Sequence, residues 1–267
     1  NKETLVAGGE LVTTRAKEKG VAILPVDSEH SAIFQSLQGS PGKQSVKRLI
    51  LTASGGPFFG RTRDDLKDVT VEQALKHPNW SMGSKITVDS ATMMNKGLEI
   101  IEALWLFDMP LEQIDVVVHP QSIVHSLVEY ADGTMLAQMA LPDMKYAIGY
   151  ALSYPERLPA FDARLDLTKI KPLEFFRYDK KNFPAVDIVR EAYSLSPLMP
   201  TVLNAANDTA VGAFLQNRIG FTDICETVRK TLDYYKNRLN GIQLSIDTVY
   251  GLDDEAKRTA ENFLKGK

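Results

Sequence analysis

The chain has 267 residues, 44% hydrophobic and 24% charged, and its 31 basic and 34 acidic side chains give a formal net charge of −3. These values exclude a disordered chain and a collagen, and the single cysteine, Cys225, excludes an intrachain disulfide and a cysteine-based zinc cluster. The slightly acidic balance gives no reason to expect a nucleic acid, and no apolar run is long enough to span a bilayer.

The first part of the chain has a pattern typical of a parallel α/β unit. We expect, in chain order, a helix over 3–19, a buried strand over 21–26, a helix over 29–37 and a second strand over 46–52. Gly20 ends the first helix, and Ser28 is a candidate cap for the second. A strand, a helix and a strand joined by short loops favour a parallel sheet.

The middle of the chain mixes short helices, loops and strands. We expect a short helix over 71–76, a loop over 77–85, an extended segment over 86–88, a long helix over 90–107, strands over 115–119, 123–130 and 134–141, and a helix over 142–153. Asp132 and Gly133 separate the last two strands, and this dipeptide is a strong hairpin signal.

The character of the chain changes at Tyr154. Four prolines and mixed charges between 154 and 184 indicate a linker or crossover segment. Beyond it we expect only helices, over 185–194, 200–216, 222–238 and 247–265. The sequence therefore predicts an α/β unit followed by a helical domain.

Two short polar stretches follow the predicted strands. Asp27 and Glu29 come directly after the first strand, where continued extended backbone would point both carboxylates the same way. Paired carboxylates favour a hard cation such as Mg²⁺ or Mn²⁺, although this triplet alone is better explained as a helix cap. Small residues at 52–57, including Ser54, leave amides and a hydroxyl accessible to an anion. Without context, a simple Gly-Pro turn explains that stretch better.

The stretch 89–99 is the most informative. Asn95, Lys96 and Glu99 share one face of the predicted helix, and Ser90 would lie at its N-terminus, where an anion such as a phosphate is stabilised. The alternative is a surface ion pair of small energy between Lys96 and Glu99. Because Gly97 costs a helix about 1 kcal/mol relative to Ala, we favour a functional explanation.

The loop 77–85 carries Trp80 and Met82, whose apolar surface must cover something. A lid over a polar site and an anchor to the core are equally compatible with the composition. His30, His119 and His125 are interpreted as structural, because no two of them have metal-ligand spacing on one helix face. The chain contains no Gly-x-Gly-x-x-Gly turn for a dinucleotide.

At these stretches the chain resembles the 1-deoxy-D-xylulose 5-phosphate reductoisomerase family, NADPH-dependent enzymes of non-mevalonate isoprenoid biosynthesis. The matching segments, in the family's order, are Asn1-Lys2-Glu3, Asp27-Ser28-Glu29, 51–58, 77–83, 90–99 and 119–122. The resemblance covers the whole chain. It implies a fold of the α/β class that lacks most of the family's N-terminal NADPH-binding domain. The implied units are a Rossmann-like remnant over 1–26, a central α+β catalytic and dimerisation domain with a mixed sheet over 27–153, a linker over 154–184 and a C-terminal helical bundle over 185–267.

The resemblance also implies roles for individual residues. Asp27, Glu29 and Glu99 would hold one divalent cation, Mg²⁺ or Mn²⁺, and with Lys2 near the reacting carbonyl they form the implied catalytic set. The substrate phosphate and nearby hydroxyls would contact Ser54, Ser90, Asn95 and Lys96. The sugar hydroxyls would contact Ser28, Glu29 and His77. The nicotinamide half of NADPH would lie near Asn1, Glu3 and Gly83. Trp80 and Met82 would lie on a closing lid.

Two other functions remain open from the residues alone. A metal-dependent phosphosugar aldolase or isomerase would use the same residues, and the missing dinucleotide turn favours it. A non-catalytic oligomerisation module would use the polar motifs only as helix caps. The resemblance implies a phosphosugar substrate, a homodimer, no nucleic acid and no membrane. No targeting segment is visible, and we expect a cytoplasmic protein if the source is bacterial.

Overall fold

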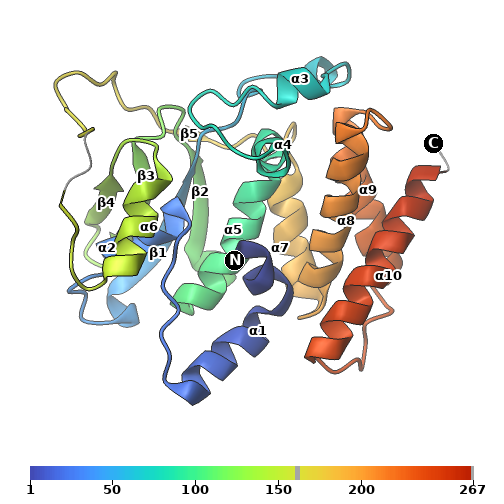
Figure 1. Ribbon diagram of the computed structural model, residues 1–267, viewed down its shortest axis with the longest axis horizontal. Helices are drawn as coiled ribbons and strands as arrows, with labels where there is room; N and C mark the ends of the chain where they lie inside the picture. Colours follow the sequence, from blue (N-terminus) through green and yellow to red (C-terminus); the bar gives the residue numbers. More distant parts are fainter. Residues whose placement is uncertain (160–162, 266–267) are drawn as a thin grey trace.

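A five-stranded mixed sheet forms one side of the protein, as the computed structural model of residues 1–159 and 163–265 shows (Figure 1). The strand order is β4-β3-β1-β2-β5. The strands are β1 (Val46–Ala53), β2 (Ile114–Val118), β3 (Val124–Tyr130), β4 (Met135–Met139) and β5 (Phe176–Arg177). β1 is parallel to β2 and antiparallel to β3, and the pairs β3–β4 and β2–β5 are antiparallel. The predicted hairpin and the mixed sheet are confirmed.

Helices make up most of the remaining structure. They are α1 (Lys2–Lys19), α2 (Ser28–Ser36), α3 (Val71–Ala74), α4 (Ser84–Thr92), α5 (Met94–Phe107), α6 (Met144–Ser153), α7 (Ala185–Leu195), α8 (Met199–Leu215), α9 (Phe221–Tyr235) and α10 (Ile246–Lys265). Figure 1 shows α7 to α10 side by side, separated from the sheet by α5. This arrangement confirms the predicted C-terminal helices. Among the described residues, no helix combines the length and hydropathy that a membrane span requires.

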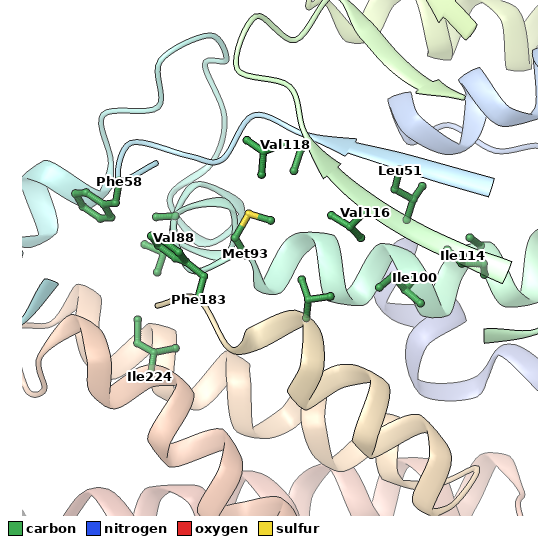
Figure 2. Packing of buried hydrophobic residues seen from close by; sticks show 14 of the residues in the cluster. Leu51, Phe58, Val88, Met93, Ile100, Ile114, Val116, Val118, Phe183 and Ile224 are labelled. Atoms are coloured by element: carbon green, nitrogen blue, oxygen red, sulfur yellow. The ribbon is translucent and has the colours of Figure 1, made fainter. Parts of the chain in front are cut away.

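Helix α5 joins two buried clusters. Ile100 contributes to a core that also contains Leu51 and Val116 of the sheet, and Figure 2 shows these side chains facing one another. Leu98 and Ile101 belong to a second core, formed with the C-terminal helices and α1. Because its apolar residues point in several directions, α5 is buried nearly all round. The polar residues at its start are therefore held by packing on both sides.

The predicted strand over 21–26 is wrong. These residues form irregular backbone, and Val21 and Val26 are 63% and 43% exposed. A strand needs a neighbouring strand to pair with, and this segment takes no part in the sheet of the described residues. The parallel pair of the sheet is instead β1 with β2, connected through α3, α4 and α5.

The predicted boundary at Ser90 is also wrong. Residues 86–88 are helical within α4, and Ser90 lies near the end of that helix. Met93 then adopts the left-handed conformation, with φ 65°, and α5 begins at Met94. The hydroxyl of Thr92 accepts a hydrogen bond from the Met94 N–H at 3.3 Å, which satisfies a free amide of the new helix. Burial of the Met93 side chain in the core favours this strained turn.

Gly97 has a packing role. A methyl group at this position would lie 2.5 Å from Cγ2 of Val189 on α7, which is closer than atoms can approach. The absence of a side chain therefore lets α5 and α7 lie against each other. This contact explains the glycine without any catalytic function.

We expect Gly97→Ala to lower the free energy of unfolding by about 1–3 kcal/mol, because α5 and α7 must separate to admit the methyl group. Gly251→Ala in α10 is the matched control. It adds the same methyl group in open space, and should be neutral or stabilising by up to about 1 kcal/mol. Thermal and chemical denaturation measure both changes. Equal stabilisation by the two substitutions would contradict the packing role.

Candidate active site

A cavity of about 570 Å³ gathers nearly all the predicted site residues. It lies among α1, α2, α4, α5 and the segments that follow β1 and α3. The predicted residues that line it are Asn1, Lys2, Glu3, Asp27, Ser28, Glu29, Ser54, His77, Trp80, Met82, Ser90, Asn95 and Lys96. Gly83 does not line it; this residue is the exposed N-cap of α4. Glu99 is fully buried and accepts hydrogen bonds from two lining residues, Asn95 and Lys96.

Three carboxylates meet at one side of this cavity. Asp27, Glu29 and Glu99 each offer an oxygen atom, and these atoms lie within 4.8 Å of one another. Asp27 and Glu29 come from the start of α2, whereas Glu99 comes from α5, about 70 residues further along the chain. Such a set of hard oxygen donors has the chemistry that Mg²⁺ or Mn²⁺ prefers.

The local geometry differs from the predicted one. Asp27, and not Ser28, occupies the N-cap position of α2, and its side chain makes no capping hydrogen bond. Glu29 is helical, so an extended backbone does not align the two carboxylates. Ser28 instead donates a hydrogen bond of 2.7 Å to Oε2 of Glu29. The Asp27 carboxylate, which is not used as a cap, faces the cavity.

Two lysines partly compensate the charge of the three carboxylates. Nζ of Lys2 lies 2.6 Å from Oδ2 of Asp27 and 3.5 Å from Oε1 of Glu99. Nζ of Lys96 lies 2.9 Å from Oε1 of Glu29 and 2.5 Å from Oε2 of Glu99. Such buried charges are tolerated only when each has partners of the opposite sign.

The side chain of Asn95 links the two groups. Its Oδ1 atom accepts a hydrogen bond of 2.6 Å from Lys2, and its Nδ2 donates one of 2.6 Å to Glu99. Asn95 and Lys96 stand in the first turn of α5. In the stretch 89–99, the helix N-terminus at the cavity is therefore that of α5, not one beginning at Ser90.

Burial and charge shift the pKa values in opposite directions within this cluster. Burial, together with the neighbouring Glu29 carboxylate, raises the pKa of Glu99 to about 7 despite the nearby lysines. Burial alone would also raise the pKa of Asp27, but the positive charges of Lys2, His30 and Lys96 together outweigh it and hold that pKa well below its usual range. Without a bound cation, the pKa of Glu99 therefore lies near neutrality.

His30 and Glu102 lie beside the triad and were missed as site residues. The fully buried His30 places Nε2 2.9 Å from the backbone oxygen of Glu99 and Nδ1 3.4 Å from Oε2 of Glu102. Burial opposes protonation of His30, but Glu102 and Asp27 raise its pKa. A sequence signal existed, because Glu102 is three residues after Glu99 and shares its helix face.

The other end of the cavity is lined by hydroxyl and imidazole groups. Oγ of Ser54 lies 2.9 Å from Nε2 of His77. Gly56, at φ 66°, lets this loop approach α4 so closely that a methyl group would lie 2.9 Å from the backbone of Ser90 and Ala91. Ser54 is therefore joined to His77 by a hydrogen bond, and its loop is joined to Ser90 by close backbone packing.

The segment 77–83 crosses the cavity and is fastened at several points. Nδ1 of His77 accepts hydrogen bonds from the backbone N–H groups of Asn79 and Trp80, at 3.2 and 3.0 Å. The amide of Asn79 donates to the backbone oxygen of Pro120 and to Ser122, at 2.6 and 2.8 Å. The Trp80 ring packs edge-on against His125, with centroids 6.1 Å apart. In this conformation the segment is tied to the turn between β2 and β3.

Comparisons with known proteins agree with these observations. Residues 23–107 match a family model for the 1-deoxy-D-xylulose 5-phosphate reductoisomerase C-terminal domain, and residues 139–259 match a model for the DXP reductoisomerase C-terminal domain. The curated 1-deoxy-D-xylulose 5-phosphate reductoisomerase of Geotalea daltonii is 54% identical over 265 residues, covering 99% of this chain and 68% of that protein. The protein of the same name from Chlorobium phaeobacteroides is 58% identical over 236 residues, covering 88% of this chain and 61% of that protein.

Solved structures give the same result. The reductoisomerase from Zymomonas mobilis in complex with NADPH is 44% identical, with a TM-score of 0.92, and the match covers 100% of this chain and 68% of that one. A DOX-P reductoisomerase in complex with NADPH, fosmidomycin and magnesium is 42% identical, with a TM-score of 0.91, over 99% of this chain and 69% of that one. The chain thus spans between three fifths and about two thirds of the length of these relatives.

We expect Glu99→Gln to weaken Mn²⁺ binding by more than about tenfold, because it removes one of three converging carboxylates. In the unchanged protein, Mn²⁺ affinity should rise from pH 6 to pH 8, since the protonated form of Glu99 predominates below its pKa of about 7 and cannot bind a cation. Titrations followed by Mn²⁺ paramagnetic resonance measure both effects. Glu112→Gln, at an exposed carboxylate outside the cavity, is the control. Equal binding by Glu99→Gln and the unchanged protein would remove Glu99 from the ligand set.

Proposed function

The chain belongs to the 1-deoxy-D-xylulose 5-phosphate reductoisomerase family, and we propose that its cavity binds the phosphosugar and the divalent cation of that enzyme. The proposed reaction converts 1-deoxy-D-xylulose 5-phosphate to 2-C-methyl-D-erythritol 4-phosphate. The observation that carries the proposal is the convergence of Asp27, Glu29 and Glu99 beside Lys96 in one cavity.

The carboxylate triad is proposed as the cation site. Its oxygen-only donor set fits Mg²⁺ or Mn²⁺, and one solved relative is a complex with magnesium. When bound, the cation supplies Lewis acidity to a ketone and its neighbouring hydroxyl. Asp27, Glu29 and Glu99 would hold the cation, and the buried His30 contacts the backbone oxygen of Glu99 and the carboxylate of Glu102 beside them.

A second group of polar residues in the cavity, which reaches from the two serines to the triad itself, is proposed to bind the phosphate. Ser54, Ser90, Asn95 and Lys96 offer hydroxyl, amide and ammonium donors that suit an anion. Contacts with a group remote from the reacting carbons supply binding energy that aligns those carbons. Ser28, Glu29 and His77, which also line the cavity, are proposed to contact the sugar hydroxyls, with Lys2 near the reacting carbonyl.

NADPH is proposed to reach the cavity from the side of α1. Two relatives are solved in complex with NADPH, which supplies a hydride when bound. Asn1 and Glu3 line the cavity at the start of α1, and we propose them for the nicotinamide half. Gly83 remains a proposal without support from the cavity lining. The chain has no Gly-rich dinucleotide turn, so the donors for the rest of the cofactor are not among its motifs.

Trp80 and Met82 are proposed as the lid. Both line the cavity, and the segment that carries them has no regular secondary structure. A lid that closes over the reacting carbons excludes water from a reactive aldehyde. The predicted division at 1–26, 27–153, 154–184 and 185–267 is likewise kept as a proposal. Within it, the linker contains β5, and residues 160–162 lie outside the described part.

A metal-dependent aldolase without nicotinamide and a non-catalytic module are both less well supported. Relatives above 50% identity carry the reductoisomerase name, and a merely structural set of caps would not bring three carboxylates to one point. The proposal is tested with fosmidomycin, the ligand named in a solved relative. Calorimetry should show tight binding when Mn²⁺ is present and binding weakened by more than about tenfold when it is chelated. Absence of binding under both conditions would refute the proposed site.

A homodimer is proposed through the edge of the sheet. Among the described residues β4 pairs with β3 alone, and Met135 and Leu136 on it are each 49% exposed. An exposed, apolar edge strand is a template for pairing with a second chain. Ile148 and Leu152 of α6, the helix that follows the hairpin, are also exposed.

We expect Leu136→Glu to shift the protein from dimer to monomer, because a buried glutamate at the interface would be desolvated without a partner. Tyr250→Glu, at an exposed aromatic residue on α10, is the control and should leave the dimer intact. Sedimentation velocity at several concentrations measures the distribution. A monomeric unchanged protein, or a dimer that survives Leu136→Glu, would exclude this interface.

A further inference from the structure

A buried polar network joins α4 to the C-terminal helices next to the cavity. Asn207 of α8 donates a hydrogen bond of 2.7 Å from Nδ2 to Oδ1 of Asp89, and both residues are almost completely buried. The second oxygen of Asp89 accepts a hydrogen bond of 2.9 Å from Lys85, one turn earlier on α4. Lys85 in turn lies 3.1 Å from Asp208 of α8 and 3.6 Å from Glu3 of α1.

Burial of these polar groups lowers the free energy of unfolding, and core packing does not explain it. A buried carboxylate requires hydrogen-bond donors to stay charged, and a pair of apolar residues would fill the same space without that requirement. The Asn207 side chain is still incompletely satisfied, because its Oδ1 accepts no hydrogen bond among the described residues. Such a network fixes the relative position of α4 and α8 more than it stabilises the fold.

The geometry that it fixes is the phosphate-binding end of the cavity. Asp89 lines the cavity and directly precedes Ser90. The same turn of α4 supports the loop of Ser54, because the backbone of Gly56 lies against Ser90 and Ala91. A shift of this turn relative to α8 would therefore move both serines. The carboxylates of the cation site stand on α2 and α5 and make no hydrogen bond with Asp89 or Asn207 within the described ranges 1–159 and 163–265.

We propose that Asp89 and Asn207 are positioning residues that hold the phosphate-binding turn of α4 against the C-terminal helices. Neither residue needs to touch the substrate. The inference rests on the proposed function, since it concerns how the two serines at that end of the cavity are placed. It gives the C-terminal helices an indirect role in substrate affinity, which acts through the buried hydrogen bond from Asn207 to Asp89.

The test compares Asn207→Leu with Asn204→Leu. Both replace a buried asparagine of α8 with a side chain of similar size, but Asn204 makes no hydrogen bond to α4, and its Oδ1 has no partner in the described part of the chain. Two affinities are measured for each variant: that for Mn²⁺ alone, by paramagnetic resonance, and that for fosmidomycin at saturating Mn²⁺, by calorimetry. We expect Asn207→Leu to weaken fosmidomycin binding by about tenfold or more, while its Mn²⁺ affinity stays within about twofold of the unchanged protein. Asn204→Leu should change neither.

A variant that exchanges the two residues, Asp89→Asn with Asn207→Asp, distinguishes loss of the hydrogen bond from misfolding of Asn207→Leu. Asn207→Asp alone places two carboxylates together and should weaken fosmidomycin binding, whereas addition of Asp89→Asn restores a donor and an acceptor and should recover part of the affinity. The inference is wrong if Asn207→Leu binds fosmidomycin as tightly as the unchanged protein. It is equally wrong if both leucine variants lose affinity alike, or if the swap brings no recovery. If the unchanged protein binds neither Mn²⁺ nor fosmidomycin, the proposed function itself fails and the inference falls with it.

Discussion

The compensation of buried charge at the cavity is the constraint on which the site depends. Asp27, Glu29 and Glu99 can lie close together only because Lys2 and Lys96 stand between them. Each lysine contacts two carboxylates, so the loss of one lysine leaves two acids incompletely paired. Three separate parts of the chain must therefore meet in a fixed arrangement: the start of α1, the start of α2 and the first turns of α5.

This compensation also links the two ends of the cavity. If a divalent cation binds the triad as proposed, the ammonium group of Lys96 would share its carboxylate partners with that cation. A buried ammonium with weakened partners is unfavourable, and the proposed phosphate would supply the missing negative charge. A site built in this way favours the cation and the phosphate together over either alone, which is a coupling between two ligands through shared charged groups.

The sequence predicted the elements whose patterns are strong and local. The hairpin around Gly133 and the C-terminal helices follow from turn chemistry and from helical periodicity. The strand over 21–26 was wrong, because an apolar run is necessary for a strand but the pairing partner is decided elsewhere. The break at Met93 was missed since left-handed backbone at a methionine has no local signature, and only burial in the core accounts for it. The purpose of Gly97 was misjudged for a similar reason, as Val189 lies far away in the sequence.

Most of the residues that line the cavity could be predicted, but their geometry could not. The order and spacing of the motifs identified the residues through resemblance, whereas the argument from extended backbone placed Asp27 and Glu29 together for an incorrect reason. An N-cap residue has β-type backbone while the next residues are already helical. The Asp27 side chain is therefore freed from the helix surface and can meet the carboxylate of a residue in the first turn. A capping position is usually interpreted as a purely structural role, yet here the absence of the capping hydrogen bond is what makes the carboxylate available. Whether an acidic N-cap bonds to its own helix or faces away from it is decided by the charges around it, and here that charge is Lys2.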